Sequence, residues 1–149
     1  MPKLDLEAIE ATNCTGYPPP FDAAVAGRWV RRLGEAAGFT DFGASHVTLE
    51  PGAASSQRHW HEEEDELVVM LSGEAVLHED QAATPMKPGD IAIFPKGRAN
   101  GHHLVNRSDR PCSFIAVGRK PVGTAHYSDI DLVWDGRASR YTHKDGAPY

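Results

Sequence analysis

The stretch 52–73 constrains the fold most, because it places two histidines and a carboxylate around two short segments of strand character. His59 and His61 are two residues apart in an extended stretch, so their side chains leave the same face of a strand. Glu66 opens the segment 66–71, which has the composition and alternation of a strand. If the two segments form a hairpin, the Glu66 carboxylate faces the same point as the two imidazoles.

Two neutral imidazoles and one carboxylate are a ligand set that Fe(II), Mn(II), Ni(II) or Zn(II) accepts. A further histidine is available where the segment 89–106 leaves a Pro/Gly turn and enters another strand. His102 and His103 compete for this role, because neighbours on a strand point to opposite faces. The acidic run 62–65 could hold an alternative ligand, although such a run between two strands is more typical of a solvated turn.

Composition excludes several classes of protein. The chain has 149 residues, which suffices for one domain with a core. Its net charge of −6 and lack of a basic arm argue against nucleic acid as a partner. Cys14 and Cys112 lie far apart and indicate no disulfide framework, so we expect a reducing compartment. No apolar run approaches the roughly 18 residues of a membrane span, and we expect a cytoplasmic protein.

Turn signals rich in Gly, Pro and Asp recur about every eight to twelve residues from residue 38 onward, a rhythm typical of an all-β sandwich or barrel. The sequence therefore predicts an all-β fold in one domain. We expect an N-terminal arm and first strands in 1–43, a barrel core in 44–118, and a last strand with an extended C-terminal arm in 119–149.

The chain resembles the cupin superfamily, whose two motifs are G-x5-HxH-x3,4-E-x6-G and G-x5-PxG-x2-H-x3-N. Two spacings depart from the motifs. Six residues instead of five separate Gly52 from His59, and four instead of two separate Gly97 from His102. Both differences fall in loops, where length is tolerated. The likeness covers about residues 44–118, and nearly the whole chain is similar to small single-domain cupins of unassigned function. The motif positions are Gly52, His59, His61, Glu66 and Gly73 in the first, and Gly89, Pro95, Gly97, His102 and Asn106 in the second.

This resemblance implies a double-stranded β-helix, or jelly-roll barrel, with a divalent metal ion inside. It assigns His59, His61, Glu66 and His102 as ligands, and the step of H-x3-N to Asn106 favours His102 over His103. Single-domain cupins are commonly dimers. Outward-facing aliphatic residues on the 66–71 strand would be costly to expose, so we expect a homodimer. They are Leu67, Val69 and Leu71.

Other residues are candidates for supporting roles. Ser55 and Gln57 share a strand face with His59, and Met70 is expected to face inward with Glu66, so all three could support the metal ligands or contact a substrate. Three arginines could pair an anionic substrate, although arginines on a strand exterior usually form surface ion pairs. These are Arg28, Arg31 and Arg32.

A divalent ion held by three imidazoles and one carboxylate keeps about one positive charge and open coordination positions. Such a centre suits an anionic or enolisable oxygen ligand. We therefore expect a metal-dependent enzyme acting on a small oxygen-bearing molecule, such as a hydroxy or keto acid, an enediol, a phenol or a sugar derivative. Dioxygenase and isomerase are the two subclasses. The alternative is a cupin that binds a small molecule without turnover and acts as a sensor through a protein partner.

Overall fold

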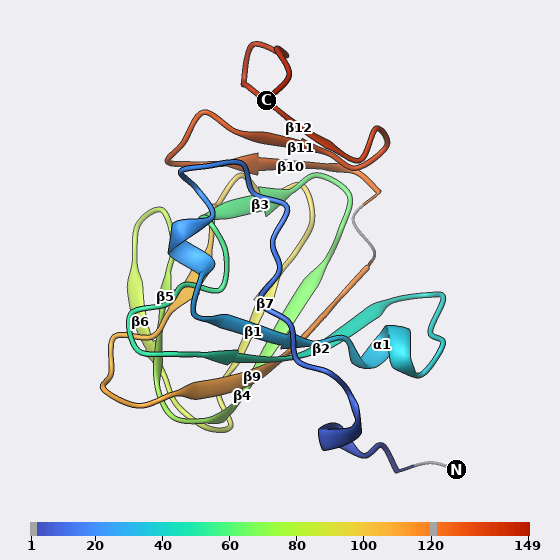
Figure 1. The fold of residues 1–149 in the computed structure, drawn as a ribbon. Helices are drawn as coiled ribbons and strands as arrows, with labels where there is room; N and C mark the ends of the chain where they lie inside the picture. The colour runs from blue at the N-terminus through green and yellow to red at the C-terminus, as the bar shows by residue number, and fades with distance from the viewer. Residues whose placement is uncertain (1–2, 120–121) are drawn as a thin grey trace.

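The computed structural model describes residues 3–119 and 122–149, and strands dominate them (Figure 1). Within these ranges no helix is long and apolar enough to cross a membrane. Two 3-10 turns, η1 (Leu6–Ala8) and η2 (Ala23–Val25), and one short helix, α1 (Leu33–Ala36), lie in the first part of the chain. The strands are β1 (Arg28–Arg31), β2 (Gly43–Leu49), β3 (His59–His61), β4 (Glu66–Ser72), β5 (Ala75–His78), β6 (Ala83–Met86), β7 (Ile91–Phe94), β8 (His103–Val105), β9 (Cys112–Gly118), β10 (Thr124–Tyr127), β11 (Val133–Asp135) and β12 (Arg140–Thr142).

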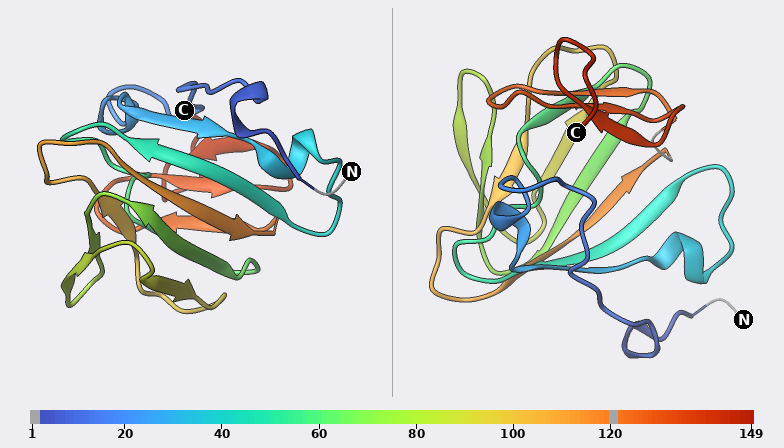
Figure 2. Two further views of the ribbon diagram at one scale, coloured as in Figure 1. Left: turned by 90° about the horizontal axis from the view of Figure 1, so that it is seen from below. Right: turned by 45° about the horizontal axis from the view of Figure 1, so that its top comes forward.

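The strands form two layers around one interior (Figures 1 and 2). One layer is a five-stranded sheet in the order β1-β2-β9-β4-β7. The other combines the sheets β12-β11-β10-β3 and β6-β5-β8, which are linked through isolated bridges from His59 to His102 and from Ala54 to Val105. All pairings are antiparallel within the described ranges. The predicted all-β jelly-roll barrel is confirmed.

Alternation along the five-stranded sheet sends one set of side chains into the core. Val68 and Met70 of β4 are 4% and 1% exposed, and the register pairs Met70 with the buried Phe114 of β9. The residues of opposite parity face away from the barrel. Leu71, Ile91 and Ile93 on β4 and β7 are 45%, 62% and 66% exposed. The outer face of this sheet edge is therefore apolar.

The predicted hairpin between the segments 59–61 and 66–71 is wrong. Strand β3 pairs with β10, whereas β4 pairs with β7 and β9 in the other layer. The acidic segment 62–65 crosses from one layer to the other instead of turning back within a sheet. The side chains of β3 and β4 therefore meet across the interior of the barrel, not side by side on one hairpin.

The C-terminal segment forms strands β10, β11 and β12, where the sequence suggested one strand and an extended arm. Figure 2 shows these strands as an orange-to-red layer beside β3, with which β10 pairs. Tyr17 from the N-terminal segment packs under this layer with Val25, Tyr127 and Leu132. This second small core holds β3 in place, because it buries apolar surface behind β10.

A candidate metal centre in the barrel

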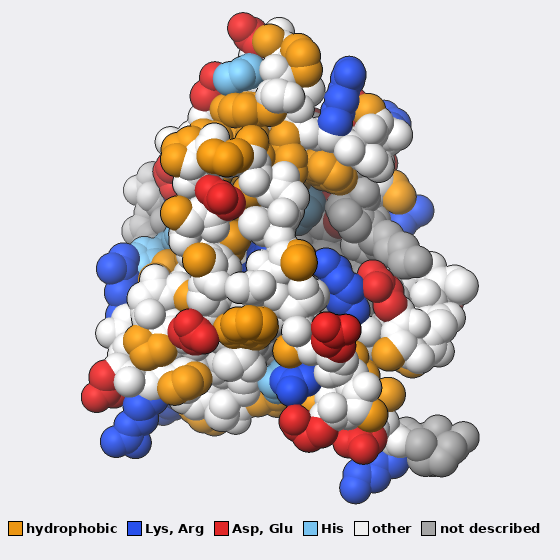
Figure 3. All heavy atoms as spheres, viewed as in Figure 1, with side chains coloured by type: hydrophobic (Ala, Val, Ile, Leu, Met, Phe, Trp, Pro, Cys, Tyr) orange, Lys and Arg blue, Asp and Glu red, His pale blue; other side chains and the backbone are white. Residues whose placement is uncertain are grey.

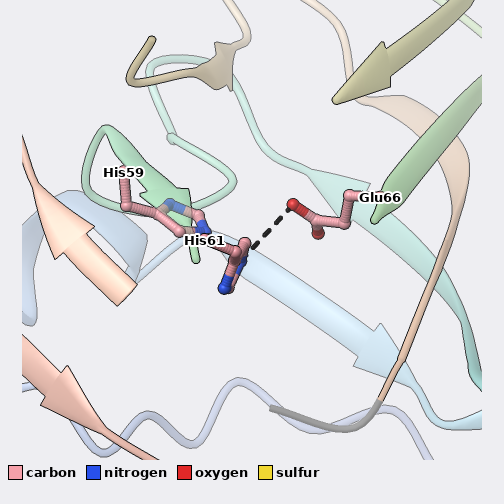
Figure 4. Close-up of side chains that lie close together, drawn as sticks. All are labelled: His59, His61 and Glu66. Atoms are coloured by element: carbon pink, nitrogen blue, oxygen red, sulfur yellow. Dashed lines mark hydrogen bonds and ion pairs between the residues drawn. The ribbon is translucent and has the colours of Figure 1, made fainter. Parts of the chain in front are cut away.

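Four side-chain donor atoms converge inside the barrel. Nε2 of His59 and Nε2 of His61 are 3.0 Å apart, and the latter lies 3.6 Å from Oε2 of Glu66 (Figure 4). Nε2 of His102 lies 3.1 Å from the same carboxylate oxygen. Two backbone hydrogen bonds between His59 and His102 fix β3 against the start of β8. The structure thus brings together the four residues that the sequence singled out.

The hydrogen bonds of the ring nitrogens indicate the tautomers of two histidines. Nδ1 of His59 is 2.9 Å from the carbonyl oxygen of Gln57. A carbonyl only accepts hydrogen bonds, so we assign the ring hydrogen of His59 to Nδ1, which leaves its Nε2 as an acceptor. His102 has two acceptors within reach, Oε2 of Glu66 at 3.1 Å from Nε2 and the carbonyl oxygen of Asn100 at 3.4 Å from Nδ1. With its hydrogen on Nε2, His102 donates to Glu66, whereas as a metal ligand it would carry the hydrogen on Nδ1.

Glu64 lies beside Nδ1 of His61, whereas Nε2 of the same ring faces Glu66. The Glu64 side chain is 2% exposed, and its Oε1 accepts hydrogen bonds from the backbone N–H groups of Val122 and Gly123 at 2.8 and 2.6 Å. Its Oε2 lies 3.2 Å from Nδ1 of His61, off the line of a hydrogen bond, and neither atom has another partner. A carboxylate beside the outer nitrogen of a histidine is the usual support of a metal-binding imidazole.

Glu64 corrects the interpretation of 62–65 as a solvated turn. Glu62 and Asp65 are exposed as expected, but Glu64 is buried, where it accepts hydrogen bonds from the backbone of Val122 and Gly123. Four acidic residues in a row carry no spacing signal that distinguishes the third. The buried role of Glu64 could be recognised only from the fold.

The local electrostatics favour the deprotonated forms of His59 and Glu66, which are the forms that metal ions require. Burial is the largest influence on His59, and it lowers the pKa of this imidazole to about 4 against the attraction of Glu66. Burial alone would raise the pKa of Glu66, but the hydrogen bond from His102 and the neighbouring imidazoles outweigh it and lower the pKa to about 2. At neutral pH the centre therefore presents a neutral His59 and an ionised Glu66.

The donor separations fit a bound ion. Donors at roughly 2.1 Å from one cation lie roughly 3.0–3.4 Å from each other, depending on the coordination geometry. The donor atoms of His59, His61 and Glu66 all lie within 4.8 Å of one another. His102 stands at the edge of this group, next to Glu66, with its ring stacked on Phe94 at 3.6 Å. These residues could hold one divalent ion.

The donors lie in a cavity of about 430 Å³. Figure 3 shows a hollow on this face of the molecule, with histidine atoms inside it and Lys or Arg side chains at its rim. The volume falls within the roughly 300–1,000 Å³ of small-molecule sites. Apolar side chains of the five-stranded sheet form much of its wall, among them Val30, Val47, Val68, Phe94 and Phe114. The cavity therefore combines a polar centre with apolar walls.

The remaining candidates lie at different distances from the cavity. Ser55 lines it, and its Oγ accepts a hydrogen bond from the backbone of Leu104. His103 also borders it, but its Nδ1 is bonded to the Ser56 carbonyl and not to the donor group. Gln57 and Met70 do not border the cavity. The Gln57 amide donates to the Phe21 carbonyl at 2.7 Å, and Met70 is packed in the core.

The three arginines near β1 behave differently from one another. Arg31 forms the expected surface ion pair, 3.2 Å from Glu7, and Arg32 lies 4.0 Å from Glu35. Arg28 and Arg32 both line the cavity, but Arg28 has no carboxylate partner among the residues that the structure describes. The sequence R-W-V-R has no alternation of polar and apolar residues, so the sequence did not show which face of β1 is the inner one.

Comparisons with known proteins agree with this geometry. A family model described as Cupin domain matches residues 45–118. A crystal structure of a sugar phosphate isomerase from a cupin superfamily, from Silicibacter pomeroyi, is 48% identical, with a TM-score of 0.94 over 99% of this chain and 96% of that one. A proposed sugar phosphate isomerase from Acidithiobacillus ferrooxidans is 26% identical, with a TM-score of 0.70 over 78% of this chain and 76% of that one.

A curated protein from Thermotoga maritima, an oxalate-binding protein, is 33% identical over 73 residues. The match covers 49% of this chain and 58% of that protein, so it spans little more than half of the relative.

Proposed function

We propose that this chain, which belongs to the cupin superfamily, is a metal-dependent isomerase of small hydroxy-carbonyl compounds such as sugar derivatives. The observation that supports this most is the convergence of three imidazoles and one carboxylate on a cavity of about 430 Å³. This set of side chains suits a divalent cation, and the cavity leaves room for a ligand beside it.

We propose His59, His61, Glu66 and His102 as the ligands of one divalent ion, with Fe, Mn, Ni and Zn as the candidates. When bound, such an ion polarises a carbonyl or hydroxyl oxygen of a substrate and so acidifies the neighbouring C–H group. Glu64 would hold the His61 ring in place through the contact between Oε2 and Nδ1. The apolar wall would exclude water from the reacting atoms.

Isomerase is favoured over dioxygenase because the 48% identical relative carries the name of a sugar phosphate isomerase. The test is a panel of aldoses, ketoses and their phosphates incubated with metal-loaded protein, with products resolved by NMR. We expect interconversion of at least one pair by the native protein and none by His61→Ala. Oxygen uptake by iron-loaded protein on the same panel, without any isomer formed, would point to a dioxygenase instead.

A binding protein without turnover is the second candidate, and the similarity to an oxalate-binding protein favours it. A divalent ion with open positions suits a dicarboxylate as well as a hydroxy-carbonyl compound. Calorimetric titration with oxalate separates the two functions. Tight binding of oxalate together with no turnover of any tested compound would support the binding role, as in a sensor that acts through a protein partner.

We also propose a homodimer formed through the outer face of β4 and β7. Leu71, Ile91 and Ile93 are 45%, 62% and 66% exposed there. β7 is the edge strand of its sheet. An exposed apolar patch on an edge strand favours contact with another chain. A second copy would cover these side chains and leave the cavity on the inner face of the sheet accessible.

The cysteines support an intracellular location. Cys14 is exposed and Cys112 is buried, and both are free thiols. Proteins of oxidising compartments rarely keep such an exposed free thiol. We therefore propose that the protein works in the cytoplasm, and cell fractionation with an antibody tests this.

A further inference from the structure

Arg28 is a cation without a counter-ion inside the cavity. Its Nη1 donates to the carbonyl oxygen of Ser55 at 2.8 Å, while its Nε is buried and has no partner. Among residues 3–119 and 122–149 no carboxylate lies within ion-pair distance of this guanidinium. The groups that act on its charge are three tyrosines and another arginine, namely Tyr17, Tyr127, Tyr141 and Arg32.

Other arginines of the chain are arranged differently. Arg58 is held by Asp80 and by both carboxylate oxygens of Asp129, and Arg31 pairs with Glu7. An arginine stays charged even when burial lowers its pKa, as it does for Arg28. Leaving such a charge unpaired in a partly buried place costs free energy that an arriving anion would recover.

The position of Arg28 relates it to the proposed metal centre. Both line the same cavity. The Ser55 carbonyl that binds Arg28 is followed directly by Ser56, whose Oγ lies 3.3 Å from Nδ1 of His59. Across the cavity wall, the ring of Tyr127 lies 5.5 Å from that of His59 and 5.6 Å from that of Tyr17, which lines the cavity with Arg28. One small molecule could contact both the centre and the guanidinium.

We propose that Arg28 binds a phosphate group on the substrate and so restricts the enzyme to phosphorylated compounds. This inference rests on the proposed isomerase function. Four of the five N–H donors of Arg28 remain free, including the buried Nε–H, and a guanidinium fork matches two phosphate oxygens. Arg32 and Arg119 also line the cavity, together with the carboxylates of Glu35, Glu64 and Glu66, so the choice of phosphate rests on the Arg28 fork and not on the net charge of the lining.

The test measures binding of inorganic phosphate by calorimetry to the full chain, both metal-loaded and after removal of metal by chelation. Arg28→Met should weaken phosphate binding by roughly tenfold to a hundredfold in both states, as expected for loss of a hydrogen-bonded charged group. Arg31→Met is the matched control, because Arg31 lies on the same strand and faces outward to Glu7. It should bind phosphate like the native protein.

Equal affinity in Arg28→Met and native protein would overturn the proposal, and so would phosphate binding that disappears from native protein when metal is removed. Acetate binding through Arg28 as tightly as phosphate would overturn the choice of phosphate. Circular dichroism and metal content serve as folding controls. If Arg28→Met fails to fold, Arg28→Lys keeps the charge without the fork and should show the same direction of change.

Kinetics separate this inference from the isomerase function on which it rests. With an isomerase substrate in hand, Arg28→Met should raise KM for the phosphorylated sugar roughly tenfold or more and leave the unphosphorylated sugar unaffected. Isomerase activity with no preference for the phosphorylated compound would remove the Arg28 proposal alone. Phosphate binding that depends on Arg28 in a protein without isomerase activity would remove the proposed reaction alone.

Discussion

Oε2 of Glu64 lies 3.2 Å from Nδ1 of His61, on the side of the ring away from the nitrogen that faces Glu66. The carboxylate is buried and anchored by two backbone N–H groups at its other oxygen. The carboxylate is thus placed to support a ring hydrogen on Nδ1 of His61, which would leave Nε2 free to bind a metal ion. The loop after β9 and the crossing between β3 and β4 therefore both contribute to the proposed metal centre.

Glu64→Gln should lower metal affinity by roughly ten- to a hundredfold, because His61 loses the carboxylate that orients it. The amide oxygen of glutamine can still accept from Val122 and Gly123, so the fold should be retained. Competition with a chromogenic chelator measures the affinity. Glu63→Gln is the neighbouring control, since Glu63 pairs with the exposed Arg137 instead of a histidine. Unchanged affinity in Glu64→Gln would contradict the role assigned to this carboxylate.

Stability of the metal-free protein should fall as the pH is lowered. Folding lowers the pKa of His59 from 6.5 to about 4 and that of Glu66 from 4.5 to about 2. In both cases the unfolded chain binds more protons, so stability present above the unfolded pKa is lost as pH falls towards the folded pKa. The windows are 6.5 to about 4 for His59 and 4.5 to about 2 for Glu66.

Urea unfolding midpoints between pH 7.5 and pH 4 measure this effect. His59→Gln should flatten the decline between pH 6.5 and pH 4, because the variant has no imidazole to protonate. A native midpoint that stays constant over this range would be inconsistent with a buried neutral His59.

Met70→Ala should cost about 2–5 kcal/mol of stability and leave metal binding intact. The side chain is 1% exposed and packed among the core residues, without bordering the cavity. Chemical denaturation and metal analysis of the same preparation check the two parts. If the variant remains folded but loses its metal, Met70 would support the metal centre, as the sequence analysis suggested.

The fold was largely predictable, whereas the pairing of strands was not. Alternation shows that His59 and His61 leave one face of a strand, but Glu66 was directed to the same point through a hairpin that does not form and through the cupin motif. Alternation does not show which strand lies next to which, and β3 and β4 are in different layers. The position of Arg28 in the cavity was also not predictable, because β1 lacks the alternation of apolar and polar residues that marks an inner face.

Ile93→Glu should convert the proposed homodimer to a monomer. Ile93 is 66% exposed on the edge strand β7. In the proposed dimer, a charge at this position would be buried in the interface, which costs free energy. Light scattering coupled to size exclusion gives the mass. Leu4→Glu, at an apolar residue 43% exposed in the N-terminal segment, should leave the mass unchanged. A native protein that is already monomeric at micromolar concentration would contradict the dimer.

Elemental analysis of anaerobically purified protein tests the central claim most directly, with native protein and His61→Ala prepared side by side. The claim is that His59, His61, Glu66 and His102 together hold one divalent ion inside the barrel. It predicts close to one equivalent of a single transition metal per native chain and little in the folded variant. Native protein without transition metal that also fails to take up Fe(II), Mn(II), Ni(II) or Zn(II) would contradict it, as would equal metal content in His61→Ala.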